Sequence, residues 1–299
     1  MTTGTSSAPR TILLATDLSP RCDRALDRAI QLARQWQARL VALTVVEPGT
    51  LSLQRVRASP RPSWSSASDD PVQRTLDLLR RDAGADDVDI VPRVEEGRIN
   101  DVLMRVAVEE GAELIVTGVA RSESFGRMVL GSSVDWLARH ATVPVLVVRD
   151  RVHGPYRNIV VASDFSPSSR LALEAAATRL PDARMTLFHA YDTPFTGNES
   201  ALQQAVNDGR AKALAEAQHV LADAALTPEQ RAAVEVVAEH GEPVRLTYEY
   251  VRDHHADLIA LGTHGRSALF DILIGSIAKR ILETAATDVL LVRKQAGAD

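Results

Sequence analysis

The stretch Ile12-Leu-Leu-Ala-Thr-Asp-Leu-Ser-Pro20 recurs 147 residues later as Ile159-Val-Val-Ala-Ser-Asp-Phe-Ser-Pro167, with apolar, small, acidic and turn-forming residues in the same order. Further along, Gly111 to Gly118 recurs as His255 to Gly262, now 144 residues apart. Each repeating unit has the size of a full domain, which disfavours a solenoid. The repeat therefore predicts two copies of one domain.

Size and composition agree with this interpretation. The chain has 299 residues, which suits two domains of roughly 150 residues. Hydrophobic residues make up 45% and charged residues 24%, which excludes wholesale disorder. A net charge of -5 and an aromatic content of 4% argue against a nucleic-acid partner. Cys22 is the only cysteine, which excludes an internal disulfide and a Cys-rich metal site.

No apolar stretch reaches the roughly 18 residues that a membrane span needs, and the N-terminal segment lacks a secretory pattern. We therefore expect a cytoplasmic protein without a membrane partner.

Short apolar runs alternate with longer amphipathic stretches in both halves. In the second half the pattern predicts strands at 158–163, 185–190, 234–238, 258–261 and 289–292, and helices at 167–180, 200–225, 243–254 and 277–285. Strands rich in Val, Ile and Leu indicate a parallel sheet covered on both faces. We expect an α/β fold of two tandem doubly wound domains, 1–150 and 157–299, joined by a linker at 151–156. Residues 48–71 are rich in Ser and Pro and are expected to form a loop.

Ligands of open parallel sheets bind beyond the carboxyl ends of the strands, where the strand order reverses. Right-handed crossovers with the first strand central would place strands one and four side by side at this point. Strand one ends at Asp164 in the second half and at Asp17 in the first. The carboxylate of Asp164 fits two interpretations, which the sequence leaves open. It accepts local amide hydrogen bonds in an Asx-turn, or it contacts a nucleoside.

A glycine-rich segment follows strand four of the second half, from Gly262 through Gly265 to Gly275-Ser276. Glycines permit close backbone approach, and the amides of Ser276 and Ile277 would lie at a helix N-terminus, which favours an anion. The segment therefore predicts a phosphate cradle. The alternative is architectural, with Gly262 forming a turn after the strand and Ser276 an N-cap.

The run Gly262-x2-Gly265-x9-Gly275-Ser276 resembles the nucleotide-binding signature of the universal stress protein family. The segments 162–166 and 289–293 resemble the first and last strands of that family, and the resemblance covers nearly the whole chain as two tandem domains. It implies a five-stranded parallel sheet between helices, Rossmann-like and of the adenine nucleotide alpha hydrolase type. It also implies a regulatory or protective stress-response protein that binds ATP together with Mg²⁺.

In ATP-binding members of the family, the base and ribose lie against the first two strands and the phosphates lie in the glycine segment. Carried over to this chain, the resemblance implies base and ribose contacts at Ala162, Ser163, Asp164 and Ala190, ribose contacts at Leu261 and Gly262, and phosphate contacts at Gly265, Gly275, Ser276 and Ile277. We expect no catalytic residue and no metal site formed by the protein alone.

The first half departs from the signature at one position. Arg121 stands where the second half has Gly265, although Gly131-Ser132 follows at the matching distance. An arginine disfavours positive φ, and its side chain would enter the phosphate space. We therefore expect a competent nucleotide site in the second half and an impaired or repurposed one in the first.

Domains of this family commonly pair through their last strands about a two-fold axis. The resemblance implies that residues 145–148 and 289–292 pair within this chain as a pseudo-dimer, which would close two apolar sheet edges. A homodimer of the whole chain and further protein partners are left open.

Other catalytic signatures are missing. The sequence contains no P-loop motif, no Gly-x-Ser-x-Gly elbow and no His-Glu-x-x-His helix. Two alternatives to a nucleotide-binding regulator stay open. One is a nucleotide-free scaffold with architectural glycine segments. The other is a slow ATPase, for which Arg266, His264 and Asp164 are the candidate residues.

Overall fold

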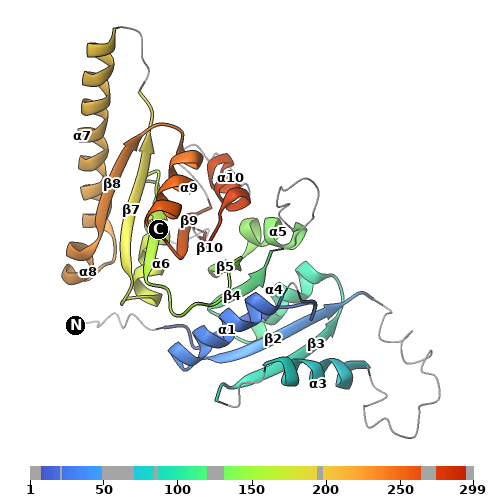
Figure 1. The fold of residues 1–299 in the computed structure, drawn as a ribbon. Coiled ribbons are helices and arrows are strands. Elements are labelled where there is room, and N and C mark those ends of the chain that lie inside the picture. Colours follow the sequence, from blue (N-terminus) through green and yellow to red (C-terminus); the bar gives the residue numbers. More distant parts are fainter. Residues whose placement is uncertain are drawn as a thin grey trace, which may run out of the picture.

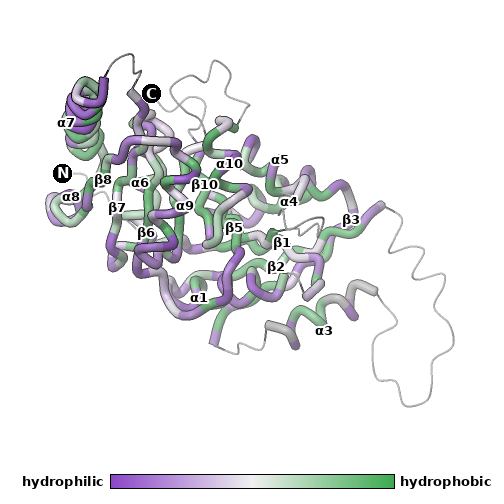
Figure 2. Tube along the Cα trace, turned by 45° about the horizontal axis from the view of Figure 1, so that its top comes forward, coloured by the Kyte–Doolittle hydropathy of each residue, from purple (hydrophilic) through white to green (hydrophobic). Residues whose placement is uncertain are grey.

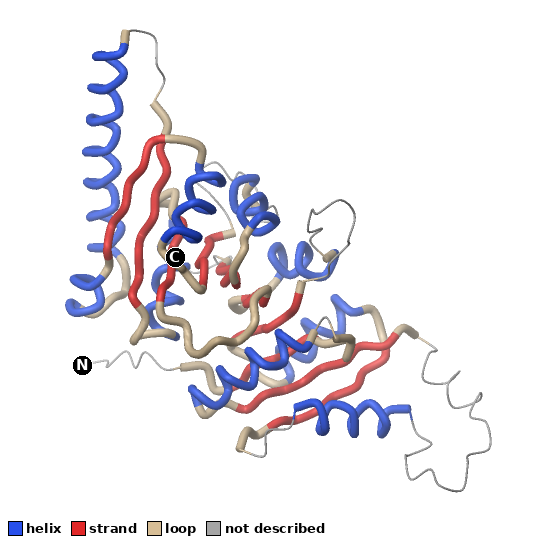
Figure 3. Tube along the Cα trace, viewed as in Figure 1, coloured by secondary structure: helices blue, strands red, loops and turns tan. Residues whose placement is uncertain are grey.

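A computed structural model describes residues 8–20, 22–48, 71–83, 87–119, 131–193, 198–263 and 274–293. Within these ranges, strands and helices alternate, except that β6 follows β5 and α8 follows α7 (Figures 1 and 3). The strands are β1 (Thr11–Ala15), β2 (Arg39–Val46), β3 (Ile90–Glu96), β4 (Leu114–Gly118), β5 (Val145–Val148), β6 (Asn158–Ala162), β7 (Arg184–Tyr191), β8 (Glu235–His240), β9 (Leu258–Gly262) and β10 (Asp288–Val292). The helices are α1 (Asp23–Trp36), α3 (Pro71–Ala83), α4 (Ile99–Glu109), α5 (Ser132–His140), α6 (Pro167–Arg179), α7 (Glu199–Asp223), α8 (Pro228–Ala233), α9 (Pro243–Asp253) and α10 (Ser276–Thr284).

All the strands belong to one sheet with the order β3-β2-β1-β4-β5-β10-β9-β6-β7-β8. Pairing is parallel within each half, whereas β5 and β10 pair antiparallel, with Leu146 opposite Leu290. Both the expected doubly wound α/β fold and the expected pairing of the last strands are therefore confirmed. Strands β2 and β3 lie at one end of this sheet and β7 and β8 at the other (Figure 1).

The core consists of apolar side chains on both faces of this sheet. Alternation along β1 illustrates the arrangement, because Ile12 and Leu14 belong to one buried cluster and Leu13 to the other. Each cluster also contains residues of the second half, so the two halves share their core. Figure 2 shows the same concentration of hydrophobic residues along the central strands.

Local sequence signals explain several helix ends. Helix α6 begins as expected, with Ser166 as N-cap, its side chain accepting a hydrogen bond from the Ser169 amide, and Pro167 in the first turn. Helix α10 begins one residue earlier than expected, at Ser276, with Gly275 as its N-cap. Cys22 directly precedes α1 as its N-cap. Most of the expected loop at 48–71 lies outside the described residues.

Asp288, at the start of β10, links the two halves from a fully buried position. Its carboxylate accepts hydrogen bonds from the amides of Arg149 and Asp150 at 2.7 and 2.9 Å and from the hydroxyl of Tyr156 at 2.5 Å. The guanidinium of Arg28, in α1, lies 3.4 Å from the same carboxylate and stacks on the Tyr156 ring. Burial raises the pKa of Tyr156 well above its ordinary value, so the phenol stays protonated. Arg149, Asp150 and Tyr156 are thereby fixed to β10.

Over the part of the chain that the structure describes, no helix has the length and apolar character needed to cross a membrane.

Candidate functional site

The strand order reverses between β6 and β9, which are neighbours in the middle of the second half. Ala162 lies opposite Leu261 where both strands end. Strands β1 and β4 are neighbours in the same way in the first half, with Ala15 opposite Thr117. Each half therefore has the topological switch point at which ligands of such sheets bind.

The turn after β6 is held by its own side chains. Asp164 accepts a hydrogen bond from the Ser166 amide at 3.1 Å, which is the expected Asx-turn. The Ser163 hydroxyl lies 2.9 Å from that of Ser169 and accepts a bond from the Phe165 amide at 3.0 Å. Phe165 has a φ of 63°, an uncommon value for a non-glycine residue. These bonds fix the turn at the carboxyl end of the strand.

His189 in β7 was not expected to take part in this edge. Its Nδ1 lies 2.7 Å from the Ser163 carbonyl oxygen, and its ring stacks on Phe165 with centroids 4.1 Å apart. The corresponding positions of the first half are Thr44 and Leu18, so this aromatic pair belongs to the second half alone. Comparing the two repeats position by position would have revealed it.

Gly262 ends β9 in close contact with helix α6. A Cβ atom at this position would lie 2.5 Å from the Ser168 carbonyl carbon and 2.6 Å from the Ser169 amide nitrogen. Only glycine fits this approach of backbone to backbone. The packing of α6 therefore gives Gly262 an architectural role, whatever else this glycine contacts.

The N-terminus of α10 lies next to the end of β9. The Gly275 amide donates to the Thr263 carbonyl at 2.8 Å, and the Thr263 amide donates to the Val292 carbonyl at 3.0 Å. Gly275 has φ -59° and ψ 142°, so its conformation does not require glycine. Among the described residues no side chain caps this helix, and its first turn carries no acidic residue. Ser276 and Ile277 are exposed.

Helix α5 begins in the same way in the first half but carries a different charge. Its N-cap Gly131 also lacks a side-chain hydrogen bond, yet Asp135 lies in its first turn. A carboxylate there interacts favourably with the positive end of the helix dipole and disfavours a second anion. The two helix N-termini therefore differ electrostatically, with α10 the better place for an anion.

The structure brings most of the expected second-half residues to one edge of the sheet. Ala162, Ser163, Asp164, Leu261, Gly262, Gly275, Ser276 and Ile277 lie at or just after the ends of β6 and β9 or at the start of α10, and Ala190 lies near the end of β7. Leu261 is 2% exposed and its side chain belongs to a buried apolar cluster. Gly265 and Arg121 lie outside the described residues, as do His264 and Arg266.

The matching edge of the first half contains Asp17 and Cys22. Asp17 accepts hydrogen bonds from the Ser19 amide at 2.9 Å and from the Cys22 thiol at 3.1 Å. Burial raises the pKa of this carboxyl, but the hydrogen bonds outweigh it, so the pKa lies below its ordinary value. Burial raises the pKa of Cys22 above its ordinary value. Within the described ranges, no three His, Cys, Asp or Glu side chains are arranged to hold a metal ion.

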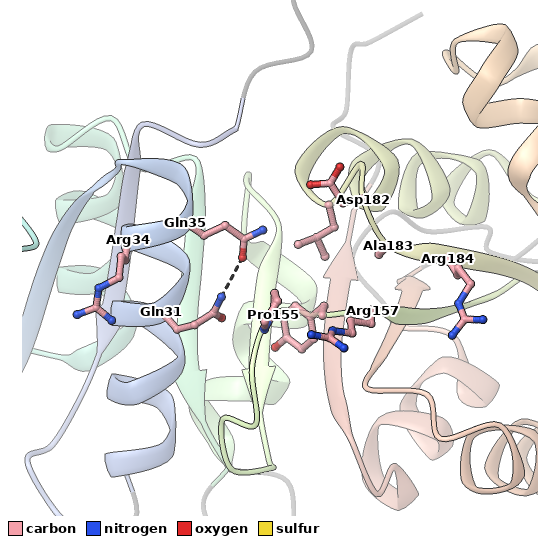
Figure 4. A pocket seen from close by; sticks show the side chains of 10 residues that line it. Gln31, Arg34, Gln35, Pro155, Arg157, Asp182, Ala183 and Arg184 are labelled. Carbon is pink, nitrogen blue, oxygen red and sulfur yellow. Dashed lines mark hydrogen bonds between the residues drawn. The ribbon is translucent and has the colours of Figure 1, made fainter.

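A pocket of about 610 Å³ lies at the opposite edge, among α1, the linker and the start of β7 (Figure 4). Pro155 and Tyr156 form part of its lining, and Gln31 donates to Gln35 at 2.9 Å on the α1 side. The guanidinium of Arg34, also in the lining, is already bound by Asp87. This pocket is separate from the carboxyl ends of the strands.

Comparison with known proteins identifies the family. A family model described as the universal stress protein family matches residues 9–149 and again 155–293. A universal stress protein of Mycolicibacterium smegmatis is 26% identical over 202 residues, which cover 63% of this chain and 64% of that relative. The alignment thus spans just under two thirds of the relative's own length.

Solved structures show the same fold at lower identity. A universal stress protein from Archaeoglobus fulgidus superposes with a TM-score of 0.63 at 17% identity, covering 97% of both chains. A functionally unknown protein from Pseudomonas aeruginosa gives a TM-score of 0.65 at 19% identity, covering 96% of this chain and 94% of its own. With the family model matching both halves of a sheet of this topology, the chain belongs to the universal stress protein family, in a tandem form.

Proposed function

We propose that this protein binds ATP with Mg²⁺ at the carboxyl edge of its second half and acts as a regulatory or protective stress-response protein. The observation that carries the proposal is the N-terminus of α10, which lies beside the end of β9 without a side-chain cap and without an acidic residue in its first turn. Exposed amides at a helix N-terminus bind phosphate well. Its position at the switch point matches the place where nucleotides bind in such sheets.

The proposed contacts follow from this geometry. The phosphates would lie against the amides of Ser276 and Ile277, and the ribose and base would lie against the turn after β6 and the main chain at Gly262. Gly265 completes the phosphate segment in the sequence signature. Since the described residues offer no cluster of metal ligands, Mg²⁺ would be held largely by the phosphates and water.

The second half is the proposed site for two independent reasons. In the sequence, Arg121 replaces the glycine that Gly265 supplies in the second half. In the structure, Asp135 occupies the first turn of α5, whereas Lys279 occupies the equivalent position of α10. Both differences disfavour a phosphate in the first half. We propose that the two domains comprise residues 1–150 and 157–299.

A matched pair of proline variants tests the site. Proline is tolerated in the first turn of a helix and removes one amide donor. The residues before both positions, Gly275 and Gly131, have ψ values of 142° and 145°, which suit a following proline. Ser276→Pro should weaken MgATP binding in calorimetry on the order of tenfold, as expected for the loss of one charge-assisted hydrogen bond. Ser132→Pro is the control and should leave the affinity unchanged.

The main alternative is a nucleotide-free scaffold. The packing of Gly262 against α6 favours the scaffold, because this packing alone explains the glycine and needs no ligand. Purified full-length protein should release ATP or ADP on denaturation if nucleotide is bound, and chromatography of the supernatant measures it. If no nucleotide is released and calorimetry detects no binding of MgATP, the protein is a nucleotide-free scaffold instead. Phosphate release from the same preparation tests the slow ATPase.

A further inference from the structure

The pairing of β5 with β10 defines a pseudo-two-fold axis inside the chain. Leu146 lies opposite Leu290 in the antiparallel register, and the two residues are 144 positions apart. This is also the offset between equivalent residues in the later part of each repeat. Leu146 and Leu290 are therefore equivalent residues that face each other, and the axis runs between them. We call β5, β10, α5 and α10 together the seam.

A residue close to such an axis meets its own equivalent from the other half. Asp135 in α5 and Lys279 in α10 are equivalent by the same offset. Their side chains meet, with the Lys279 Nζ 3.7 Å from the Asp135 Oδ1. Asp135 is also bound by Arg139 one turn further along α5. With side chains 21% and 43% exposed, this is a partly buried contact between opposite charges.

The alternative pairings of the halves would place like charges at this point. Two first halves joined through the seam would bring Asp135 against a second Asp135. Two second halves would bring Lys279 against a second Lys279. Like charges that face each other across an interface disfavour binding of the wrong partner.

We propose that the opposite charges of Asp135 and Lys279 select the pairing of unlike halves, so that the surface of each half at the seam fits the other half and not a copy of itself. In a symmetric pair of identical halves, a residue on the two-fold axis would meet its own copy, so complementary charges would be impossible there. The two repeats differ in charge at this position. This selection is independent of any ligand.

A double-variant cycle in the full chain tests the contact. Asp135→Lys and Lys279→Asp each place like charges at the seam, whereas the double variant restores opposite charges in the reverse order. The double variant should raise the unfolding equilibrium constant by a factor about two- to fivefold smaller than the product of the factors for the two single variants, and this difference should shrink at high salt. Since the cycle cancels effects common to one position, the lost contact with Arg139 does not affect it. If the factor for the double variant equals the product of the two single factors, the proposal is overturned.

Mixing the two single variants tests partner choice. When the two chains are refolded together at high concentration, opposite charges meet only in assemblies that contain one chain of each variant. Native mass spectrometry should show mixed two-chain species above the statistical ratio of 2:1 over each same-variant species, whereas the double variant alone should show the same assembly state as the wild type. A statistical ratio despite a measurable coupling would overturn the proposal, because the contact would then stabilise without discriminating.

Discussion

Replacing Asp288 with asparagine removes a negative charge from the most buried polar position between the two halves. Asp288 is fully buried, and Arg28, its ionic partner, is 4% exposed. Asparagine has nearly the same shape and keeps an oxygen that can accept from the Arg149 and Asp150 amides. The change therefore keeps the backbone hydrogen bonds, while it removes the charge and the oxygen that accepts from the Tyr156 hydroxyl.

The expected loss follows from what remains around Arg28. Its guanidinium keeps the carbonyl of Gly154 at 2.8 Å, the side chain of Gln31 at 3.0 Å and the ring of Tyr156. It loses its only ionic partner among the described residues, and removing one member of a buried ion pair costs about 3–5 kcal/mol. Because these contacts remain, we expect the lower end, about 3 kcal/mol. Against a total of about 5–15 kcal/mol, this is a large fraction of the free energy of unfolding.

Urea denaturation of Asp288→Asn and the wild type, followed by circular dichroism, measures the difference. Asp253→Asn is the matched control, because Asp253 pairs with Arg252 on the surface, and it should unfold like the wild type. Adding Arg28→Met to Asp288→Asn should recover part of the loss, since the unpaired buried cation is then removed. A loss below about 1 kcal/mol in Asp288→Asn would refute the assignment of the buried charge pair as a stabilising link.

Three further predictions concern single positions. His255 has a φ of 49° where the equivalent Gly111 has 60°, so His255→Gly should raise the free energy of unfolding by about 0.5–1 kcal/mol in thermal melts, and no gain would show that the strain is relieved elsewhere. Gly262→Ala should lower the free energy of unfolding by about 1–3 kcal/mol, because its Cβ would overlap the backbone of α6. A urea midpoint equal to that of the wild type would contradict this packing. The raised pKa of Cys22 leaves less thiolate at neutral pH, so mass spectrometry should find its alkylation by iodoacetamide slower than that of free cysteine, and equal rates would count against burial of the thiol.

The architecture was predictable because its signals are local and occur twice. A strand was expected at 258–261 and β9 spans Leu258–Gly262; a helix was expected at 167–180 and α6 spans Pro167–Arg179. Short helix α8 was missed, although Thr227 and Gln230 form a capping box that the sequence displays. The pairing of strands one and four was expected from right-handed crossovers with the first strand central, and β1 with β4 and β6 with β9 confirm it.

The site was less predictable because its contacts join distant segments. The Asx-turn at Asp164 was one of two interpretations, and the bond from Ser166 confirms it, while a nucleoside contact stays a prediction. No local sequence pattern predicts the packing of Gly262 against α6, because the two segments are distant in the sequence. Asp288 has no signal either, because the equivalent position of the first half is Pro144 and the partners of the carboxylate come from the linker and α1.

The antiparallel pairing of β5 with β10 also changes how the assembly responds to dilution. Two separate chains joined by such a strand pair would come apart as their concentration falls, and their melting temperature would depend on concentration. Here both strands belong to one chain, so the effective concentration of one half near the other is set by the linker and does not change with the amount of protein. A molecule of this kind keeps its paired state even when only a few copies are present.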